Sequence, residues 1–452
     1  MFMTQNPDHK IVILGAGITG LTAARKLSEK YHNRVILVEK ENYVGGLAAT
    51  FYEKGMAFDF GSHRIHADWD NKPFGLVLDL LGEDLLKRPR RGLIKIGDNF
   101  MPYPATPFGL GAAFGPGRSF KFFCDYLLSN AKRVLIKKKR EDFESYALSR
   151  VGPSFYKIFF KPYAEKLCGT VPTEISYEMA RNRLGNFKFS KILSRLASRT
   201  HQTNNRRVFY YPREGIGQIT SVLRKQFLNN GGVLYLDTKV AAIHSADNGV
   251  ERVEFERLGG EKFSAKADQV VSTIPLPDLL QLCGLLTQSR KSLFSYRGLC
   301  VVNLRLSSGP AGDNETFYIP ETRWKIGRVS EIHKYSPFLN NDRKDFSTVL
   351  TMEIPCSEGG PVWSMNEMDL GKVCFDELKR LGIVRDASAQ ILDTAIRRAA
   401  NVYPVLRLGW RDELERAIGA LDKIANLYLV GRSALFLHCN IDHCVQMGTA
   451  LA

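Results

Sequence analysis

The chain has 452 residues, of which 44% are hydrophobic and 24% are charged, so it is long enough for two or three packed domains. It contains no run of 18 apolar residues and no pattern of a secretory signal, so we expect a cytoplasmic protein without a membrane-spanning helix. Its eight cysteines form no CxxC pair, which argues against a metal site, and its net charge of +16 indicates either an anionic partner or a solvated basic surface.

Residues 10–40 have the pattern strand, turn, helix, strand. The segment KIVILGAGITG runs four apolar residues into glycines, LTAARKLSEKY has helical spacing, and RVILVEK is rich in β-branched residues. This order predicts a βαβ unit with parallel strands.

The turn of this unit carries the pattern GxGxxG at Gly15, Gly17 and Gly20. The first glycine permits the tight turn, the second lets the backbone approach a pyrophosphate, and the third lets helix and strand pack closely. Glu39 follows Gly20 by 19 residues, and its carboxylate can accept hydrogen bonds from a ribose diol. The unit therefore predicts a dinucleotide site, but the glycines alone do not distinguish NAD from FAD.

Beyond the first βαβ unit, the expected secondary structure changes twice along the chain. Between about 75 and 200, segments such as SFKFFCDYLLSNAKRVLIKKKR and SKILSRLASR predict helices with basic faces. After about 207 the chain reads as α/β again, with strands expected over 296–355 and helices over 364–400. We predict a discontinuous dinucleotide-binding domain at 1–75, 205–290 and 400–452, a mainly helical region at 76–204, and a substrate-binding β/α region at 291–399.

Three dispersed segments resemble one large flavoprotein family, which contains amine oxidases, protoporphyrinogen oxidases and UDP-galactopyranose mutases. ENYVGGLAATF, with Gly45 and Gly46, is similar to the family's glycine pair after the second strand, although Tyr43 stands where the family usually has arginine. LYLVGR, with Gly431 and Arg432, resembles the closing strand and turn at the flavin, and ADQVVSTIP resembles the returning strand. The resemblance implies FAD as the cofactor and an α/β fold whose parallel sheet forms a Rossmann-like FAD domain, with inserted helical and β-rich regions.

Four further segments resemble UDP-galactopyranose mutases. FDFGSHRIH is like a loop that lies against the flavin ring, with His63 in the histidine position and Ser62 in place of a glycine. GRVSEIHKYSP and VYPVLRLGWRDEL resemble segments whose arginine and tyrosine bind the substrate phosphates, which implies these roles for Arg328 and Tyr403.

The fourth segment, NIDHCVQMG, resembles the mutase segment near flavin and substrate. It assigns Asn440 to the substrate side, and Asp442 and His443 to the cofactor. The stretch from Arg432 to Asn440 is shorter than in eukaryotic mutases and holds no tyrosine, so its nearest rings are Phe436 and His438.

Each of these residues also has a structural explanation. His63 and His443 could be hydrogen-bonded core histidines, Arg328 could be one end of a surface ion pair, and Tyr403 beside a proline could be a packed turn residue.

The first functional hypothesis is a mutase-like enzyme of nucleotide-sugar or cell-surface sugar metabolism. As the resemblance implies, N5 of reduced flavin would attack the anomeric carbon and expel the nucleotide diphosphate, with Arg328 and Tyr403 stabilising the leaving charge. The substrate would be an anionic small molecule, NAD(P)H is a candidate reductant, and no nucleic acid is expected. The alternative is an oxidoreductase of the amine oxidase or protoporphyrinogen oxidase type, which moves hydride from substrate to flavin.

A third, non-catalytic hypothesis concerns SFKFFCDYLLSNAKRVLIKKKR, which is basic and aromatic in the way of a peripheral membrane helix. A packed helix with a solvated basic end is the simpler interpretation of the same segment.

Overall fold

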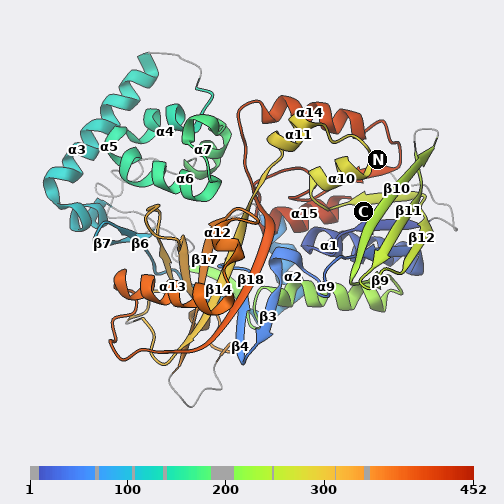
Figure 1. Ribbon diagram of the computed structural model, residues 1–452, viewed down its shortest axis with the longest axis horizontal. Coiled ribbons are helices and arrows are strands. Elements are labelled where there is room, and N and C mark those ends of the chain that lie inside the picture. Colours follow the sequence, from blue (N-terminus) through green and yellow to red (C-terminus); the bar gives the residue numbers. More distant parts are fainter. Residues whose placement is uncertain are drawn as a thin grey trace.

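A computed structural model describes residues 10–66, 71–103, 107–135, 140–184, 208–246, 249–310, 312–340 and 347–451. Figure 1 shows a parallel sheet with its helices on the right, a large mostly antiparallel sheet beside it, and a group of helices at the other end of the molecule. This is the α/β architecture that the sequence predicts.

A five-stranded parallel sheet forms the core of the first region, in the order β19-β13-β1-β2-β9. Its strands are short, and β1 and β13 are fully buried, as expected for a parallel sheet that is covered on both faces. The strands come from three distant parts of the chain: β1 Ile11–Leu14, β2 Val35–Val38, β9 Val233–Tyr235, β13 Gln269–Ser272 and β19 Leu427–Leu429.

Helices and a small sheet cover the two faces of the parallel sheet. Ile11 and Ile13 of β1 share a hydrophobic core with one set of helices: α1 Ile18–Tyr31, α2 Asn71–Leu81, α9 Gly217–Asn229 and α15 Ile441–Ala450. Val12 and Leu14 point to the opposite core, which contains three-stranded β10 Thr238–Ala246, β11 Gly249–Arg257 and β12 Lys262–Lys266, together with α10 Leu276–Leu282 and α14 Trp410–Leu421.

The second sheet has seven strands in the order β18-β14-β17-β16-β15-β6-β7. All of its strand pairs are antiparallel except β15 with β6. The strands are β6 Gly92–Ile96, β7 Asn99–Tyr103, β14 Tyr296–Leu306, β15 Thr316–Tyr318, β16 Arg328–Glu331, β17 Thr348–Cys356 and β18 Ile391–Pro404. Helix α13, Glu367–Arg380, packs on one face, and the hairpin β3 Thr50–Glu53 with β4 Met56–Asp59 packs on the other.

The remaining helices gather at the far end of the molecule (Figure 1). They are α3 Pro107–Leu135, α4 Phe143–Val151, α5 Pro153–Phe155, a π-helical stretch Tyr156–Phe160, α6 Lys161–Cys168 and α7 Tyr177–Leu184. Nearby in the chain, β5 Leu85–Pro89 pairs with β8 Val208–Pro212, so the region expected to be mainly helical also supplies three strands, β5 to β7. The helix expected at 190–199 lies outside the described residues, and none of the described helices is long and apolar enough to cross a membrane.

One expectation about secondary structure is confirmed only in part. Residues 364–400 were expected to carry helices; α13 is a helix there, but Ile391–Pro404 forms the long strand β18. The segment AIRRAA has good helix formers, yet it pairs with β14 along its length and buries Ala395 completely. Tertiary pairing overrides local propensity at this position.

Candidate functional site

Two glycine turns meet at the carboxyl edge of the parallel sheet. Gly15 and Gly45 both have left-handed backbone angles, with φ of +96° and +102°, and the N–H of Gly45 donates to the carbonyl of Ala16 at 2.8 Å. A Cβ on Gly20 would lie 2.0 Å from the Gly15 carbonyl oxygen, whereas a Cβ on Gly17 would meet nothing within 4 Å. Gly20 is therefore required for packing, and Gly17 faces open space.

Glu39 follows β2 and is hydrogen-bonded to the GxGxxG turn. Its Oε2 accepts a hydrogen bond from the N–H of Ala16 at 2.7 Å, and its Oε1 accepts one from the N–H of Glu41 at 3.1 Å. Burial raises the pKa of this carboxyl above its usual value. The structure places Glu39 beside the GxGxxG turn, and its contact with a ribose stays a prediction.

Arg432 ties the C-terminal turn to the large sheet. Its Nη1 donates to the Cys439 carbonyl at 2.6 Å and its Nη2 donates to the Val402 carbonyl at 2.7 Å. The preceding Gly431 has φ +98°, and a Cβ there would lie 3.0 Å from the side chain of Thr19 in the first turn of α1. The closing turn thus packs directly on the start of α1, and its approach to the flavin stays a prediction.

His63 lies in the loop that follows β4. Within the described part of the chain, its Nδ1 is buried and has no hydrogen-bond partner. Burial, together with the positive charges of Arg328 and Arg432, lowers the pKa of His63 to about 3. These charges show that the fold brings His63, Arg328 and Arg432 together, and that the imidazole is neutral near pH 7.

Arg328 begins β16 and faces Glu353 of β17. Its Nε and Nη2 donate to Oε1 and Oε2 of Glu353, each at 2.6 Å, and Oε1 also accepts the N–H of Ser62 at 2.7 Å. Glu353 keeps only 4% of its side chain exposed, whereas Arg328 keeps 26%. The pKa of Arg328 is raised well above its usual value: burial acts against the charge, but Glu353 outweighs it. Arg328 therefore belongs to an ion pair, but to a largely buried one and not to the surface pair of the structural explanation, and this pair fixes the orientation of the guanidinium.

Tyr403 stacks on His438, with ring centroids 6.4 Å apart and planes at 16°. Nε2 of His438 donates to the Pro404 carbonyl at 2.8 Å. Tyr403 is also among the groups whose charge acts on the pKa of Arg328, so it lies within electrostatic range of that guanidinium. Of the two rings between 432 and 440, Phe436 is fully buried in the core, and His438 is the one that accompanies Tyr403.

Asn440, Asp442 and His443 lie at the start of α15. Asn440 is exposed at the N-cap position and makes no side-chain capping bond. Asp442 is buried, with its Oδ1 3.1 Å from Nδ1 of His443, whose own side chain is 56% exposed. The alternative of a core histidine is therefore wrong for His443, and the roles of all three residues stay predictions.

Sequence reasoning missed a second group of basic residues next to His63. Arg64 is buried, its Nη2 lies 3.0 Å from Oε1 of Glu315, and its guanidinium sits over the ring of Tyr335 at 5.4 Å. Burial, Arg90 and Arg64 lower the pKa of His66 to about 4. The run HRIH could have signalled this group, because it places three basic residues, two histidines and an arginine, in four positions of a loop that enters the core.

Glu353, the partner of Arg328, was missed as well. Its signal was a single carboxylate inside the apolar strand TVLTMEIPC, where a buried charge requires a partner.

These residues fit FAD. The open space over Gly17 admits a pyrophosphate, α1 starts there without a side-chain cap, and the unpartnered Nδ1 of His63 offers a hydrogen-bonding atom to a flavin ring.

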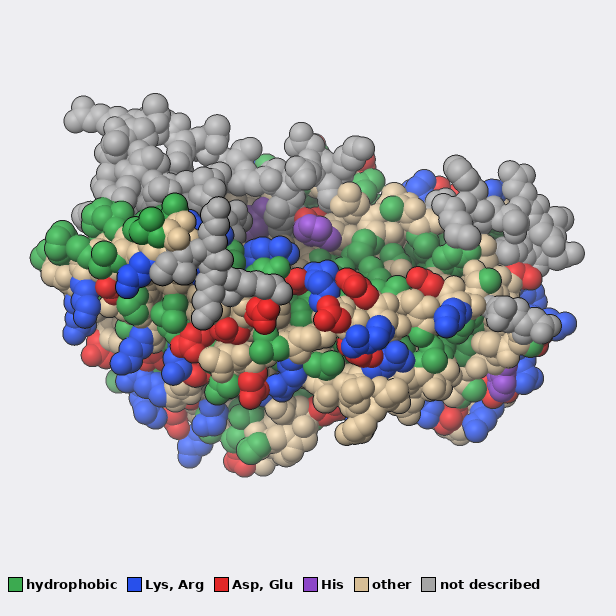
Figure 2. Space-filling model, turned by 90° about the horizontal axis from the view of Figure 1, so that it is seen from above, with side chains coloured by type: hydrophobic (Ala, Val, Ile, Leu, Met, Phe, Trp, Pro, Cys, Tyr) green, Lys and Arg blue, Asp and Glu red, His purple; other side chains and the backbone are tan. Residues whose placement is uncertain are grey.

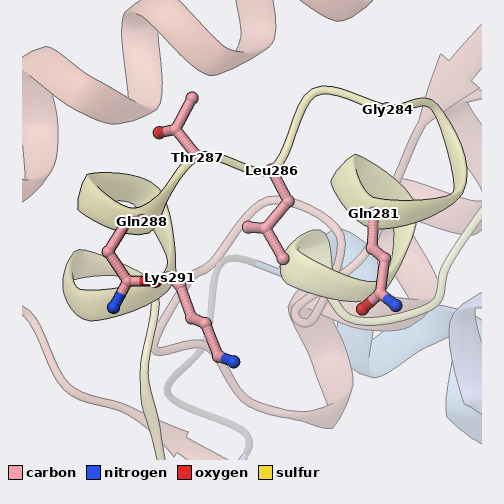
Figure 3. A pocket seen from close by; sticks show the side chains of 6 residues that line it. All are labelled: Gln281, Gly284, Leu286, Thr287, Gln288 and Lys291. Carbon is pink, nitrogen blue, oxygen red and sulfur yellow. The ribbon is translucent and has the colours of Figure 1, made fainter.

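A surface pocket of about 380 Å³ lies elsewhere, between α10 and α11 Gln288–Leu293 (Figure 3). It contains none of the predicted site residues, and its lining is Gln281, Gly284, Leu286, Thr287, Gln288 and Lys291. With one charged side chain and no cluster of reactive groups, it suggests no function.

Comparisons with known proteins identify the family of the chain. Residues 13–78 match the model of an NAD(P)-binding Rossmann-like domain, and residues 119–452 match that of flavin containing amine oxidoreductases. Among solved structures, that of a reduced UDP-galactopyranose mutase is similar over 98% of this chain and 94% of its own, at a TM-score of 0.80 and 21% identity. A putative protoporphyrinogen oxidase from Exiguobacterium has a TM-score of 0.73, at 18% identity, over 98% of this chain and 97% of its own.

Curated relatives match only in part. A probable UDP-galactopyranose mutase from Klebsiella pneumoniae is 25% identical over 178 residues, which is 37% of this chain and 43% of that protein. An inactive all-trans-retinol 13,14-reductase from Danio rerio is 37% identical over 76 residues, 17% of this chain and 12% of the relative. The match spans less than half the length of these curated relatives. The model match over most of the chain nevertheless shows the family: the chain belongs to the flavin containing amine oxidoreductases, as an FAD-dependent enzyme.

Proposed function

We propose that this enzyme binds an anionic, diphosphate-bearing sugar nucleotide and rearranges it in the manner of a UDP-galactopyranose mutase. The observation that carries the proposal is the guanidinium of Arg328, which Glu353 holds in a fixed plane beside the neutral His63. The likeness to a UDP-galactopyranose mutase structure over nearly the whole chain supports the same conclusion.

The geometry of Arg328 suits a phosphate. Because Nε and Nη2 are both engaged by Glu353, Nη1 is the nitrogen left to reach a substrate oxygen. A guanidinium that is already oriented loses less entropy on binding and stabilises charge that develops on a leaving diphosphate. Tyr403 can add its hydroxyl from β18 of the same sheet, and its stacking on His438 limits the motion of its ring.

Reduced FAD, when bound here, would supply nucleophilic chemistry at its N5 atom. His63 is neutral, so it can donate or accept a hydrogen bond at the flavin without placing a positive charge there. The two glycine turns, which are joined by the Gly45–Ala16 hydrogen bond, and Glu39, which accepts the N–H of Ala16, would hold the dinucleotide.

The charges around His63 and His66 are of both signs. Both histidines have a lowered pKa, first through burial and then through nearby arginines. Two of these arginines, Arg328 and Arg64, pair with Glu353 and Glu315, so the choice between a diphosphate and an amine substrate is made by direct measurement.

The test compares the two chemistries in one preparation. The protein, reduced with dithionite, is incubated with UDP-galactose or UDP-galactofuranose, and the sugar ring form is measured by chromatography. In parallel, amines are added anaerobically to the oxidised protein while the flavin absorbance is followed. We expect interconversion of the sugars only with reduced flavin and no bleaching by amines. Rapid bleaching by an amine, with no sugar nucleotide bound or converted, would assign the site to oxidoreduction instead.

A further inference from the structure

Helix α3 has one face packed and one face open. Its path is broken at Gly115, where φ is 75°, just before Pro116, and the long part of the helix follows this kink. Phe122 is buried there and packs edge-to-face on Phe155 of α5, and Phe123 and Tyr126 pack partly against the same core. This face attaches the helix to the rest of the molecule.

The opposite face carries an apolar stripe that nothing in the described structure covers. Its members are large and strongly exposed: Phe120 67%, Leu127 48%, Leu128 61%, Val134 70% and Leu135 81%. They recur at intervals of seven and eight residues, which a helix of 3.6 residues per turn places on one side. Figure 2 shows apolar side chains gathered at the left end of the molecule, where α3 lies in Figure 1, with basic side chains below them.

Basic residues flank the stripe. Lys121 and Lys132 are exposed, and their helical positions border the stripe on one edge. Residues 118–140 contain eight lysines or arginines and a single acidic residue, Asp125. The carboxylate of Asp125 accepts the N–H of Ser154 in α5 at 3.1 Å, so it is turned toward the molecule and leaves the outer face positive.

A second observation indicates crowded positive charge at the end of α3. Partial burial, and then the charges of Arg150 and Arg140, lower the pKa of Arg133. Arginines from α3, from the start of the next described segment and from α4 therefore meet at one place and repel one another.

We propose that the outer face of α3 docks on the surface of a bilayer that contains anionic phospholipids, with the apolar stripe inserted among the lipids and the basic residues at the headgroups. Charge decides between this occupant and a second copy of the chain, because two copies meeting on this face would bring their own lysines and arginines together. The inference is independent of the substrate proposed above.

Vesicle sedimentation tests the proposal with the FAD-loaded full chain. One set of vesicles is phosphatidylcholine alone, and in the other about a third of the lipid is phosphatidylglycerol. The wild type is expected to sediment with the anionic vesicles and much less with the neutral ones, and added salt is expected to weaken the binding. Leu128→Glu with Leu135→Glu, and separately Lys121→Glu with Lys132→Glu, should each weaken binding about tenfold or more.

The matched controls are Leu258→Glu and Met368→Glu, which change apolar residues that are 85% and 80% exposed on other elements. Their vesicle binding should stay at the wild-type level, and FAD content should be equal in all variants. The proposal is wrong if the wild type sediments with neither vesicle, or if the stripe variant binds as well as the wild type. It is also wrong if ultracentrifugation shows a dimer that only the stripe variant dissociates, because the face would then be a contact between copies.

Discussion

Arg328 and Glu353 face each other on neighbouring strands, in register, and both carboxylate oxygens of Glu353 accept from the guanidinium at 2.6 Å. Tyr318 is in register with Arg328 on the other side, and the guanidinium lies 5.9 Å from the centre of its ring. The sheet thus sets the position of the Arg328 guanidinium before any substrate binds. Substitutions at Arg328 and Glu353 can therefore show separately how the pair affects substrate binding and how it affects the stability of the fold.

Arg328→Lys is expected to weaken the binding of UDP and UDP-galactose about tenfold, because lysine keeps the charge and loses the planar fork. FAD content should not change, since the dinucleotide turns lie on other segments. Isothermal titration at fixed low salt measures the effect. The control is Arg305→Lys, which alters another arginine–carboxylate pair in the same sheet, with Asp393, and should bind as the wild type does. If the wild type and Arg328→Lys bind UDP and UDP-galactose equally well, Arg328 is not part of the substrate site.

Arg328→Ala should weaken the same binding by roughly thirty-fold or more. It also leaves the buried Glu353 without its partner, which should lower the free energy of unfolding by about 3–5 kcal/mol. The double variant Arg328→Met with Glu353→Gln removes both charges, so we expect it to recover most of the stability without recovering binding. Urea unfolding and titration of UDP separate the two effects, and a double variant that binds UDP normally would contradict the proposed role.

Gly17→Val should give a folded protein that does not retain FAD. The backbone at Gly17, with φ −65° and ψ 173°, is open to any residue, and the new side chain would occupy the open space where we place the pyrophosphate. Gly20→Ala should instead destabilise the fold, because its Cβ would lie 2.0 Å from a carbonyl oxygen. Gly419→Val in α14, where a Cβ also meets nothing within 4 Å, is the control and should remain yellow. Absorbance at the flavin band measures FAD retention, and circular dichroism measures folding. A Gly17→Val protein that retains FAD fully would contradict the placement of the pyrophosphate over Gly17.

His63→Ala should change the reduction potential or the absorbance spectrum of the bound flavin while the fold stays intact. In the wild type, the potential should show no inflection from His63 between about pH 5 and 9, because burial and two arginines keep the imidazole neutral. Potentiometry at several pH values tests both statements. If the variant folds, binds FAD and has an unchanged potential and spectrum, His63 is a packing residue.

The same pKa has a consequence for stability. His63 titrates at about 3 in the folded protein and near 6.5 when unfolded, so between these values the unfolded chain holds a proton that the folded chain lacks. The free energy of unfolding should fall as the pH drops from 6.5, by up to about 1.4 kcal/mol per pH unit from this residue. Chemical unfolding at pH 5 and 7 should show a smaller pH effect in His63→Ala than in the wild type.

Asp59 is expected to have the opposite effect on the pH dependence of stability, because it lowers the free energy of unfolding as the pH rises. It is fully enclosed at the end of β4, its Oδ1 accepts from Oγ1 of Thr50 at 2.6 Å, and burial raises its pKa to about 7. Stability from its protonated form is fully present below pH 3.8 and is lost as the pH rises through 7. Asp59→Asn, which is neutral at every pH, should therefore lose less stability than the wild type between pH 4 and 7. An identical pH dependence of unfolding in both proteins would show that Asp59 is ionised throughout.

Local patterns predicted the dinucleotide-binding half of the fold well. The βαβ unit and the glycine turns at Gly15 and Gly45 depend on neighbouring residues, so the sequence shows them directly. The pairing of Arg328 with Glu353 depends on the register of two strands that are separated by an irregular connection, and no local signal sets that register. Strand β18 was missed for the same reason, because β14, its partner, lies about ninety residues earlier in the chain.

The parallel sheet is assembled from both ends of the chain, and this order affects synthesis. Strand β19 and helix α15 lie beyond residue 426, and α15 crosses α1 so closely that a Cβ on Gly448 would sit 2.6 Å from the Thr19 carbonyl oxygen. A nascent chain therefore leaves one edge of β13 unpaired and one side of α1 uncovered until residues 427–450 have been synthesised. Cofactor loading should begin only after these residues have emerged, and chains truncated at residue 426 should accumulate as apoprotein that requires chaperones.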